Sequence, residues 1–510
     1  MLSLLNTPRY NRRMQTIFHE KIQRLKQALP QTDWLDSSAQ RLAYERDANV
    51  LIAQAPTLIA LPTSPQAVAS VVKACSKLDI PFTTRGAGTG LAAGSVPHSP
   101  DCLMISTARL NQIIAIDADA LTAHVQAGVV NGVLNDALAP YGLMYAPDPS
   151  SQKACTLGGN WAANAGGVHC IGYGVTTDHL HALQVVTPQG DLLWTAPNTQ
   201  ESNPLTQAFN ALYCGSEGTL GILTEAIVQL TPLPKHVGVA LLAFESVESA
   251  MQAVTSLTAS GLSSKAVEFM DALTIRCVNN TFKVGLPEDA QGVLLLELAY
   301  YYEAELVDAY TALHCLVQGW NALSFAWETS PQRRDALWKA RKGAVSSYGQ
   351  LSPMFYVLDS VIPRSALPYV LREIEAISKK VDLPIANVFH AGDGNLHPHL
   401  MFRDTQDSTI ARVKAGADAI FELCLSVGGV LSGEHGIGLE KVSHMVDQFD
   451  DASLEAQRAV WQALDARGLA NPMKQLPQKG CCGESGHHKD TLHRAKGLSV
   501  QGLVHQGLWI

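Results

Sequence analysis

Apolar residues near the start of the chain alternate between strand and helix spacing. A run at Thr57–Leu61 predicts a buried strand, and Thr63 or Ser64 followed by Pro65 is typical of the start of a helix. The residues that recur at helical spacing behind this start, and so predict the buried face of the helix, are Val68, Val71, Val72 and Cys75. A second short strand, at Ile80–Thr83, leads directly into a glycine-rich loop.

The second half of the chain alternates in the same way. Strand-like runs at Val237–Phe244 and Val293–Tyr300 alternate with helix-like runs at Ser249–Leu257 and Glu303–Val317. This order predicts an α+β domain in which helices cover one face of a sheet. We therefore divide the chain into a helical lead-in at residues 1–50, a glycine- and valine-rich domain at residues 51–235 and a second domain at residues 236–460.

Composition and charge narrow the class of protein. The 510 residues suffice for two or three domains, and 47% hydrophobic with 16% charged residues excludes a disordered chain. A net charge of −9 gives no reason to expect nucleic-acid binding. No apolar run reaches the roughly 18 residues that predict a transmembrane segment, and the N-terminus has no signal-peptide pattern. We expect a cytoplasmic protein with reduced cysteines, associated with a membrane only through a partner.

The first candidate ligand loop is Arg85–Gly90, followed by Gly94 and Ser95. Glycines allow backbone N–H groups to approach a diphosphate because no side chain intervenes. In the dinucleotide-binding fingerprint a helix follows directly, whereas Leu91–Pro97 reads as further loop. The segment is therefore a phosphate cradle of another kind or an ordinary turn.

Two further glycine-rich segments, at residues 156–167 and 215–222, favour the phosphate cradle over the ordinary turn. Thr156–Asn160 and Ala163–Gly167 combine small residues that let backbone lie flat against a planar ligand, and Asn160 and Asn164 offer hydrogen-bonding groups to a ring. Gly215–Ile222 adds a third close-approach loop. Three such loops in one domain favour a bound planar, phosphate-bearing ligand over ordinary turns.

Histidines gather in the second domain. His390 precedes a glycine turn, and His397 and His399 follow it at the period of two that places side chains on one strand face. Glu434 and His435 lie between two glycines further along. Two histidines and a glutamate can bind a divalent metal such as Zn, Mn or Fe, although isolated histidines are more often hydrogen-bonded structural residues.

Taken together, these motifs resemble a known family. Residues 45–478 resemble the FAD-linked branch that contains D-lactate dehydrogenase, D-2-hydroxyglutarate dehydrogenase and the glycolate oxidase flavoprotein subunit, within the vanillyl-alcohol oxidase and para-cresol methylhydroxylase superfamily. Asn164–Cys170 with Tyr173–Thr177 is most similar to the glycolate oxidase flavoprotein subunit. The resemblance implies an α+β fold with a para-cresol methylhydroxylase-type FAD-binding domain and an α+β cap domain built on an antiparallel sheet.

The resemblance also implies which residues contact FAD. Those expected at the pyrophosphate are Gly86, Ala87, Gly88, Thr89, Gly90, Gly94 and Ser95. Those expected to line the rest of the cofactor are Pro147, Asp148, Gly158, Gly159, Asn164, Gly166, Glu217, Gly218 and Ile222. The first loop lacks the histidine that carries covalent flavin in some relatives, so we expect non-covalent FAD.

The C-terminal part contains one more motif of the family. Asn471–Lys474 resembles an Asn-Pro-Gly-Lys motif that returns to the flavin, with Met473 in place of glycine, and Asn471 is a further expected cofactor-side residue. Residues 461–478 are therefore assigned as a return segment to the FAD-binding domain. The tail at 479–510 is expected to be disordered, although Cys481, Cys482, His487 and His488 could bind a metal.

By the same resemblance, His390, His397 and Glu434 are metal ligands, His435 is the catalytic base, and Arg341 binds the substrate carboxylate. A metal ion on the substrate hydroxyl would lower its pKa, His435 would take the proton, and a hydride would pass from the α-carbon to flavin N5. The expected reaction is oxidation of a small 2-hydroxy acid of the glycolate or D-lactate type. Val345, one helical turn after Arg341, argues against a dicarboxylic substrate.

Two other functions remain open at this point. The chain could be an electron-transfer flavoprotein active only with an iron–sulfur partner, because it has no Cys-x-x-Cys-x-x-Cys run of its own. It could also be a metal-free flavin alcohol oxidase of the same superfamily, which the histidine and glutamate motifs disfavour. A homodimer is compatible with either function.

Overall fold

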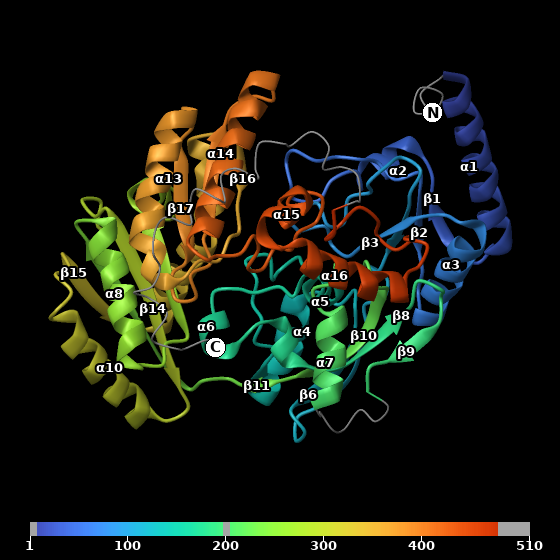
Figure 1. Ribbon diagram of the computed structural model, residues 1–510. Coiled ribbons are helices and arrows are strands. Elements are labelled where there is room, and N and C mark those ends of the chain that lie inside the picture. Colours follow the sequence, from blue (N-terminus) through green and yellow to red (C-terminus); the bar gives the residue numbers. More distant parts are fainter. Residues whose placement is uncertain (1–7, 197–203, 478–510) are drawn as a thin grey trace.

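Two domains lie side by side in the computed structural model, which describes residues 8–196 and 204–477 (Figure 1). The first domain begins with helices α1 (Pro8–Ala28), α2 (Ser38–Leu42) and α3 (Pro65–Leu78). These accompany a sheet ordered β1-β2-β4-β3, formed by β1 (Asp33–Leu35), β2 (Leu58–Leu61), β3 (Phe82–Arg85) and β4 (Leu103–Ser106). The predicted strand before Ser64 is confirmed, and the lead-in contributes β1 to the same sheet.

Helix α3 forms where its capping residues predict. Ser64 Oγ accepts the Ala67 N–H at 3.1 Å, and Pro65 is the first helical residue. The predicted apolar face of the helix is buried in one cluster with Phe82 of β3. Strand β3 starts two residues later than predicted, at Phe82, and ends at Arg85, so it delivers the first glycine loop directly from the sheet edge.

A second sheet completes this domain. Its antiparallel strands are ordered β5-β6-β10-β8-β9, and their bounds are β5 (Ile113–Asp117), β6 (Thr122–Gln126), β8 (Leu180–Val186), β9 (Leu192–Trp194) and β10 (Ile222–Gln229). The remaining elements are α4 (Asn131–Leu138), β7 (Leu143–Met144), α5 (Leu157–Ala163), α6 (Cys170–Tyr173), α7 (Pro204–Tyr213) and β11 (Thr231–Pro232). The second glycine-rich segment runs into α5, and the third joins α7 to β10.

The second domain is built on a seven-stranded antiparallel sheet ordered β15-β12-β14-β13-β17-β18-β16. Its strands are β12 (His236–Phe244), β13 (Ala266–Asp271), β14 (Gly292–Tyr300), β15 (Ser324–Glu328), β16 (Met354–Val357), β17 (Ile385–His390) and β18 (Pro398–Phe402). Its helices are α8 (Val247–Ser260), α9 (Ala272–Phe282), α10 (Glu303–Val317), α11 (Pro331–Lys342), α12 (Ala344–Ser347), α13 (Leu367–Val381) and α14 (Asp407–Ser426). The predicted strands, helices and antiparallel sheet are confirmed.

The prediction that only one face of this sheet is covered was wrong. Leu242 and Phe244 of β12 pack in one cluster with residues of α8, α10, α13 and α14. Leu241 and Ala243 point the other way, into a cluster with α9, α11 and α12. The nearly continuous apolar runs of β12 and β14 are the signature of strands buried on both faces, since a one-sided strand alternates with polar residues.

The chain then returns to the first domain through α15 (Met445–Gln448) and α16 (Asp451–Leu464), which lie over that domain in Figure 1. The Phe82 N–H donates to Leu469 O at 2.9 Å, and the Asn471 N–H donates to Phe82 O at 2.7 Å. Residues 469–471 therefore run alongside the strand that carries the first glycine loop. The predicted tail at 479–510 lies outside the described residues.

No helix within residues 8–196 and 204–477 has the length and apolar character needed to cross a bilayer.

Candidate active site

A cavity of about 620 Å³ is lined by residues of both domains. The predicted residues that line it from the first domain are Gly86, Ala87, Gly88, Thr89, Gly90, Gly94, Ser95, Gly158, Gly159, Glu217, Gly218 and Ile222. Those that line it from the second domain are Arg341, His390, His397, Glu434 and His435. The fold therefore brings the glycine-rich loops and the histidine motifs to one place.

The glycine loops have the features of a polar ligand cradle. A Cβ at Gly86 would lie 2.2 Å from Thr156 Oγ1, so the first loop packs directly on the start of α5. The buried hydroxyl groups of Thr84, Ser95 and Thr156 line the cavity and have no hydrogen-bond partner among the described residues. Buried hydroxyls are nearly always paired, so this wall fits a ligand rich in hydrogen-bonding atoms, as FAD is.

Five predicted cofactor residues do not line the cavity: Pro147, Asp148, Asn164, Gly166 and Asn471. Asn164 ends α5 in the left-handed conformation, and its Oδ1 accepts the Thr177 N–H at 2.9 Å. Gly166 packs on Glu434, because a Cβ there would lie 2.8 Å from Glu434 Oε2. Asn471 donates to the carbonyl oxygens of Gly94, at 3.0 Å, and of Glu217.

His390, His397 and Glu434, which we call the donor set, converge at the end of β17. Glu434 Oε1 lies 3.5 Å from His390 Nε2 and 3.1 Å from His397 Nε2. The opposite ring nitrogens are engaged elsewhere: His390 Nδ1 with Glu268 Oε1 at 2.8 Å, and His397 Nδ1 with Leu358 O at 3.2 Å. Such outer contacts orient the two rings so that both Nε2 atoms face Glu434, as the outer contacts of metal sites do. The pKa of His390 is raised by Glu268 and Glu434 despite burial, so this ring would release a proton on binding a metal.

The protonation state of His397 also suits a metal ligand. Its Nε2 is buried and makes no hydrogen bond within the described residues, despite its closeness to Glu434. Burial lowers the pKa of His397, which favours the neutral imidazole that coordinates metals. The donor set therefore fits a divalent ion. His399, two residues on, also lines the cavity.

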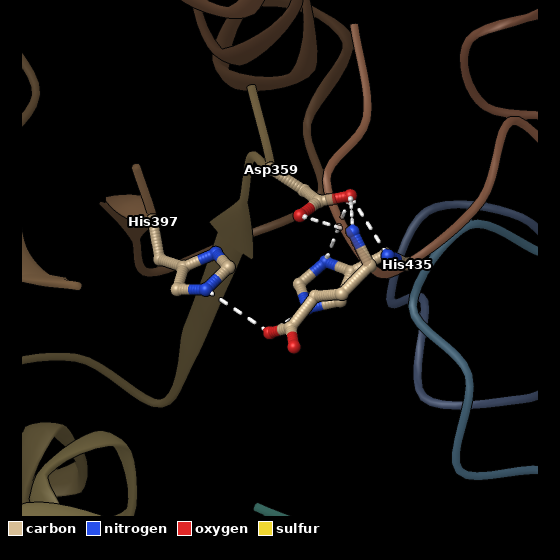
Figure 2. A group of neighbouring side chains, drawn as sticks. Asp359, His397 and His435 are labelled. Carbon is tan, nitrogen blue, oxygen red and sulfur yellow. Dashed lines mark hydrogen bonds and ion pairs between the residues drawn. The ribbon is translucent and has the colours of Figure 1, made fainter. Parts of the chain in front are cut away.

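Asp359, which the sequence did not single out, organises the loop that carries the predicted base. Residues 433–438, here called the base loop, direct the N–H groups of Gly433, Glu434 and His435 at the Asp359 carboxylate, the last at 2.8 Å. Figure 2 shows this carboxylate beside the His435 backbone and His397 across the same space. Lys441 Nζ donates to Asp359 at 3.1 Å.

Asp359 also acts on the His435 ring. His435 Nδ1 lies 3.9 Å from Asp359 Oδ2. Burial opposes a charge on the ring, but Asp359 and Glu434 raise the pKa of His435. Asp359, His397, Glu434 and His435 offer ligand atoms within 4.8 Å of one another. The Asp359 oxygens already accept several N–H donors. We therefore assign Asp359 to holding the base loop in position and not to binding the metal.

Arg341 is buried near the end of α11 and shares a partner with the donor set. Its Nη2 donates to Glu268, whose other oxygen pairs with His390. Glu268 is fully buried, and burial raises its pKa, but Arg341 and His390 lower it below its usual value. Sequence reasoning missed Glu268, although a lone carboxylate within the apolar run Ala266–Met270 was a signal. The second domain also contributes four apolar residues to the cavity wall, Val345, Phe355, Val357 and Val388, beside the polar Lys342, Ser346 and His399.

Asp148 belongs to a second network, which joins the two domains. His169 of the first domain lies between Asp148 Oδ2, 2.8 Å from Nδ1, and Glu297 Oε1, 3.2 Å from Nε2. Lys342 Nζ donates to Asp148 at 2.8 Å, and Trp338 Nε1 donates to Glu297 at 2.7 Å. The Asp148 carboxylate thus contacts the residue next to Arg341, while its predicted role at the cofactor stays a prediction.

Comparison with known proteins identifies the family. The family model described as "FAD binding domain" matches residues 56–196, and "FAD linked oxidases, C-terminal domain" matches residues 233–475. The glycolate oxidase subunit GlcD of Escherichia coli (strain K12) is 39% identical over 468 residues, which cover 91% of this chain and 93% of the relative. The chain belongs to the FAD-linked oxidase family.

Other matches agree with this membership. A D-lactate dehydrogenase of Anaerostipes hadrus is 29% identical over 426 residues, covering 82% of this chain and 89% of the relative. The crystal structure of p-cresol methylhydroxylase superposes with a TM-score of 0.75 at 16% identity, over 90% of this chain and 96% of that chain. These findings confirm the predicted fold class and FAD as cofactor of this FAD-linked oxidoreductase. The first domain is accordingly its FAD-binding domain, and the second its cap domain.

The network around His169 predicts how stability depends on pH. Burial opposes its charge, but Asp148 and Glu297 raise the pKa of His169 to about 10. A raised pKa means that the interaction stabilises fully below the ordinary histidine pKa of about 6.5 and is lost as pH rises through 10. His169→Gln should therefore destabilise on the order of 3 kcal/mol at pH 6, and progressively less toward pH 10.

Urea unfolding of the wild type and of His169→Gln at pH 6, 8 and 10 measures this difference. Because both proteins share every other titrating group, only the gap between their unfolding midpoints matters. An equal gap at pH 6 and pH 10 would show that folding does not shift the pKa of His169, and a gap that is larger at pH 10 would show that His169 is uncharged in the folded protein.

Proposed function

We propose that this FAD-linked oxidase family member oxidises a small 2-hydroxy acid of the glycolate or D-lactate type to the 2-oxo acid, with non-covalently bound FAD. The observation that carries the proposal is the shared cavity, where the glycine loops of the FAD-binding domain face Arg341, His435 and the donor set. The printed names of the relatives, a glycolate oxidase subunit and a D-lactate dehydrogenase, support this substrate class.

Arg341 binds the substrate carboxylate in this proposal. A guanidinium group matches a carboxylate with two parallel hydrogen bonds, and Arg341 retains donors beyond the one used by Glu268. The apolar wall that includes Val345 and Phe355 suits a hydrogen or methyl substituent on the α-carbon. Lys342 also lines the cavity, but Asp148 engages its ammonium group, so it is not free for a second substrate carboxylate.

His435 accepts the hydroxyl proton of the substrate. The base loop holds its backbone through Asp359, and the Asp359 carboxylate raises its proton affinity. FAD, when bound, supplies the two-electron acceptor for the hydrogen on the α-carbon. A divalent ion bound by His390, His397 and Glu434 would supply a Lewis acid beside the substrate hydroxyl.

A second candidate function is that of a flavoprotein subunit that works with an iron–sulfur partner. The matched Escherichia coli relative is named as a subunit of glycolate oxidase, which favours this candidate. The two candidates share the same half-reaction, so they differ only in where the electrons go. Dye reduction by the purified protein tests the half-reaction that both candidates share. Reoxidation of the reduced flavin only after an iron–sulfur protein is added would favour the subunit.

The first test of the proposed function is flavin reduction. The purified protein should be yellow, release intact FAD on heat or acid denaturation, and bleach anaerobically with glycolate or D-lactate. Flavin that stays attached after denaturation would contradict non-covalent binding. If the protein binds FAD but none of the 2-hydroxy acids tested reduces the flavin, the proposed reaction is wrong.

Substitution of Arg341 tests carboxylate binding. Arg341→Ala should raise KM for the hydroxy acid by an amount equivalent to about 2–5 kcal/mol, because the substrate carboxylate loses its buried partner, while FAD stays bound. Arg334→Ala is the matched control, since Arg334 lies on the same helix but away from this cavity. If KM is equal in both variants, Arg341 serves only to neutralise Glu268.

Adjacent residues of the base loop should have separable functions. Glu434→Gln should lose bound metal, because a neutral amide is a poor ligand for a divalent ion, and activity should fall with metal content. His435→Asn should keep metal and FAD but slow flavin bleaching by roughly 10²–10⁴-fold. Metal analysis together with stopped-flow bleaching distinguishes the two, and loss of metal in His435→Asn would make His435 a ligand instead of the base.

A further inference from the structure

The base loop is held from both domains by buried carboxylates. Asp359 of the cap domain accepts N–H groups from its first half. Glu217 of the FAD-binding domain accepts the N–H groups of its second half, from Ile437 at 2.6 Å and from Gly438 at 2.8 Å. One oxygen of Glu217 serves each donor, so the carboxylate spans two consecutive peptide units.

The contact between Glu217 and the base loop is close-packed. A Cβ at Gly436 would lie 2.8 Å from Glu217 Oε1, and one at Gly438 would lie 1.8 Å from the Ala92 carbonyl oxygen. The Leu439 N–H also donates to Ala92 O at 3.1 Å. The loop therefore follows the surface of the FAD-binding domain with no room for a side chain between them.

Glu217 is itself fixed at the cofactor side of the cavity. It has a left-handed backbone with φ of 52°, and its neighbour Gly218 lines the cavity. Its carbonyl oxygen accepts the Asn471 side-chain amide, which also donates to Gly94 O at 3.0 Å. The first glycine loop, the return segment and the base loop thus meet at one residue.

We propose that Glu217 is a positioning residue whose carboxylate sets the place of His435 relative to the flavin. The cofactor loop and the base belong to different domains, so their relative position depends on contacts such as this one. A carboxylate is needed because both of its oxygens accept. A glutamine would offer one acceptor and would turn its amide N–H groups toward a second donor. This inference rests on the proposed role of His435 as base.

Glu217→Gln in the FAD-loaded enzyme tests the proposal. We expect unchanged FAD and metal content, little change in KM, and a kcat that is lower by roughly 10- to 100-fold, together with slower flavin bleaching. A loss of this size is typical when an outer contact of an active site is removed. Amide hydrogen exchange should quicken at Ile437 and Gly438 while residues 86–95 stay protected. If Glu217→Gln does not accumulate as holoenzyme, Glu217→Asp replaces it, with the charge kept but the reach shortened.

The matched control is Glu225→Gln. Glu225 is another buried glutamate of the FAD-binding domain, and its carboxylate pairs with His124 at 2.9 Å and Gln126 at 3.1 Å, outside this cavity. Glu225→Gln should leave kcat and amide hydrogen exchange in the base loop unchanged. Loss of FAD from Glu217→Gln with normal exchange at residues 437–438 would overturn the proposal and make Glu217 a cofactor ligand. An unchanged kcat in Glu217→Gln would also overturn the proposal.

A double variant separates this proposal from the proposed function. If Glu217 acts through His435, adding Glu217→Gln to His435→Asn should cause little further loss of kcat. Full additivity of the two losses would overturn the positioning role. If His435→Asn alone has no effect on bleaching, the base assignment fails instead.

Discussion

Backbone N–H groups in the base loop set the constraint on which this site depends. A glycine-flanked loop that is neither helix nor strand has no regular partners for its N–H groups, and buried N–H groups must be paired. Asp359 and Glu217 meet this need, and the N–H donors in turn make burial of two carboxylates tolerable. Neither the loop nor the carboxylates would hold this arrangement alone.

Glu268 couples the two functional halves of the cap domain in a similar way. Its carboxylate pairs with Arg341 on one side and with His390 on the other. The group proposed to bind the substrate carboxylate and one proposed metal ligand therefore share a buried counter-charge. A substitution at any of the three changes the electrostatic environment of the other two, so their kinetic effects will not add.

The sequence predicted what is local and missed what is distant. Capping at Ser64, the strands around the histidine turn and the glycine loops were readable because the residues that define them are close neighbours. Glu217 lies 220 positions from Ile437, and Asp148 lies 194 positions from Lys342. The family resemblance assigned Glu217 and Asp148 to the cofactor, but no spacing rule names a partner in another domain. The two-sided sheet was missed for a different reason. The order of strand-like and helix-like runs does not say how many faces of a sheet are covered, whereas the absence of polar alternation in β12 and β14 does.

Charge balance gives a physical reason for the proposed ion and for a monocarboxylic substrate. Glu268, Glu434 and a bound substrate carboxylate would place three negative charges around the cavity, and Arg341 supplies one positive charge. The pKa of His390 is raised beside Glu268 and Glu434 despite burial, but His390 would give up its proton and its charge on binding a metal. Unpaired buried charge is costly, and a divalent ion at the donor set would supply the missing two. Asp359 is balanced by Lys441, and Lys342 is engaged by Asp148. Arg341, Lys441 and Lys342 therefore each have a carboxylate partner already. A second substrate carboxylate would find none of these cations unpaired, and it would lie near the valine and phenylalanine side chains of the cavity wall.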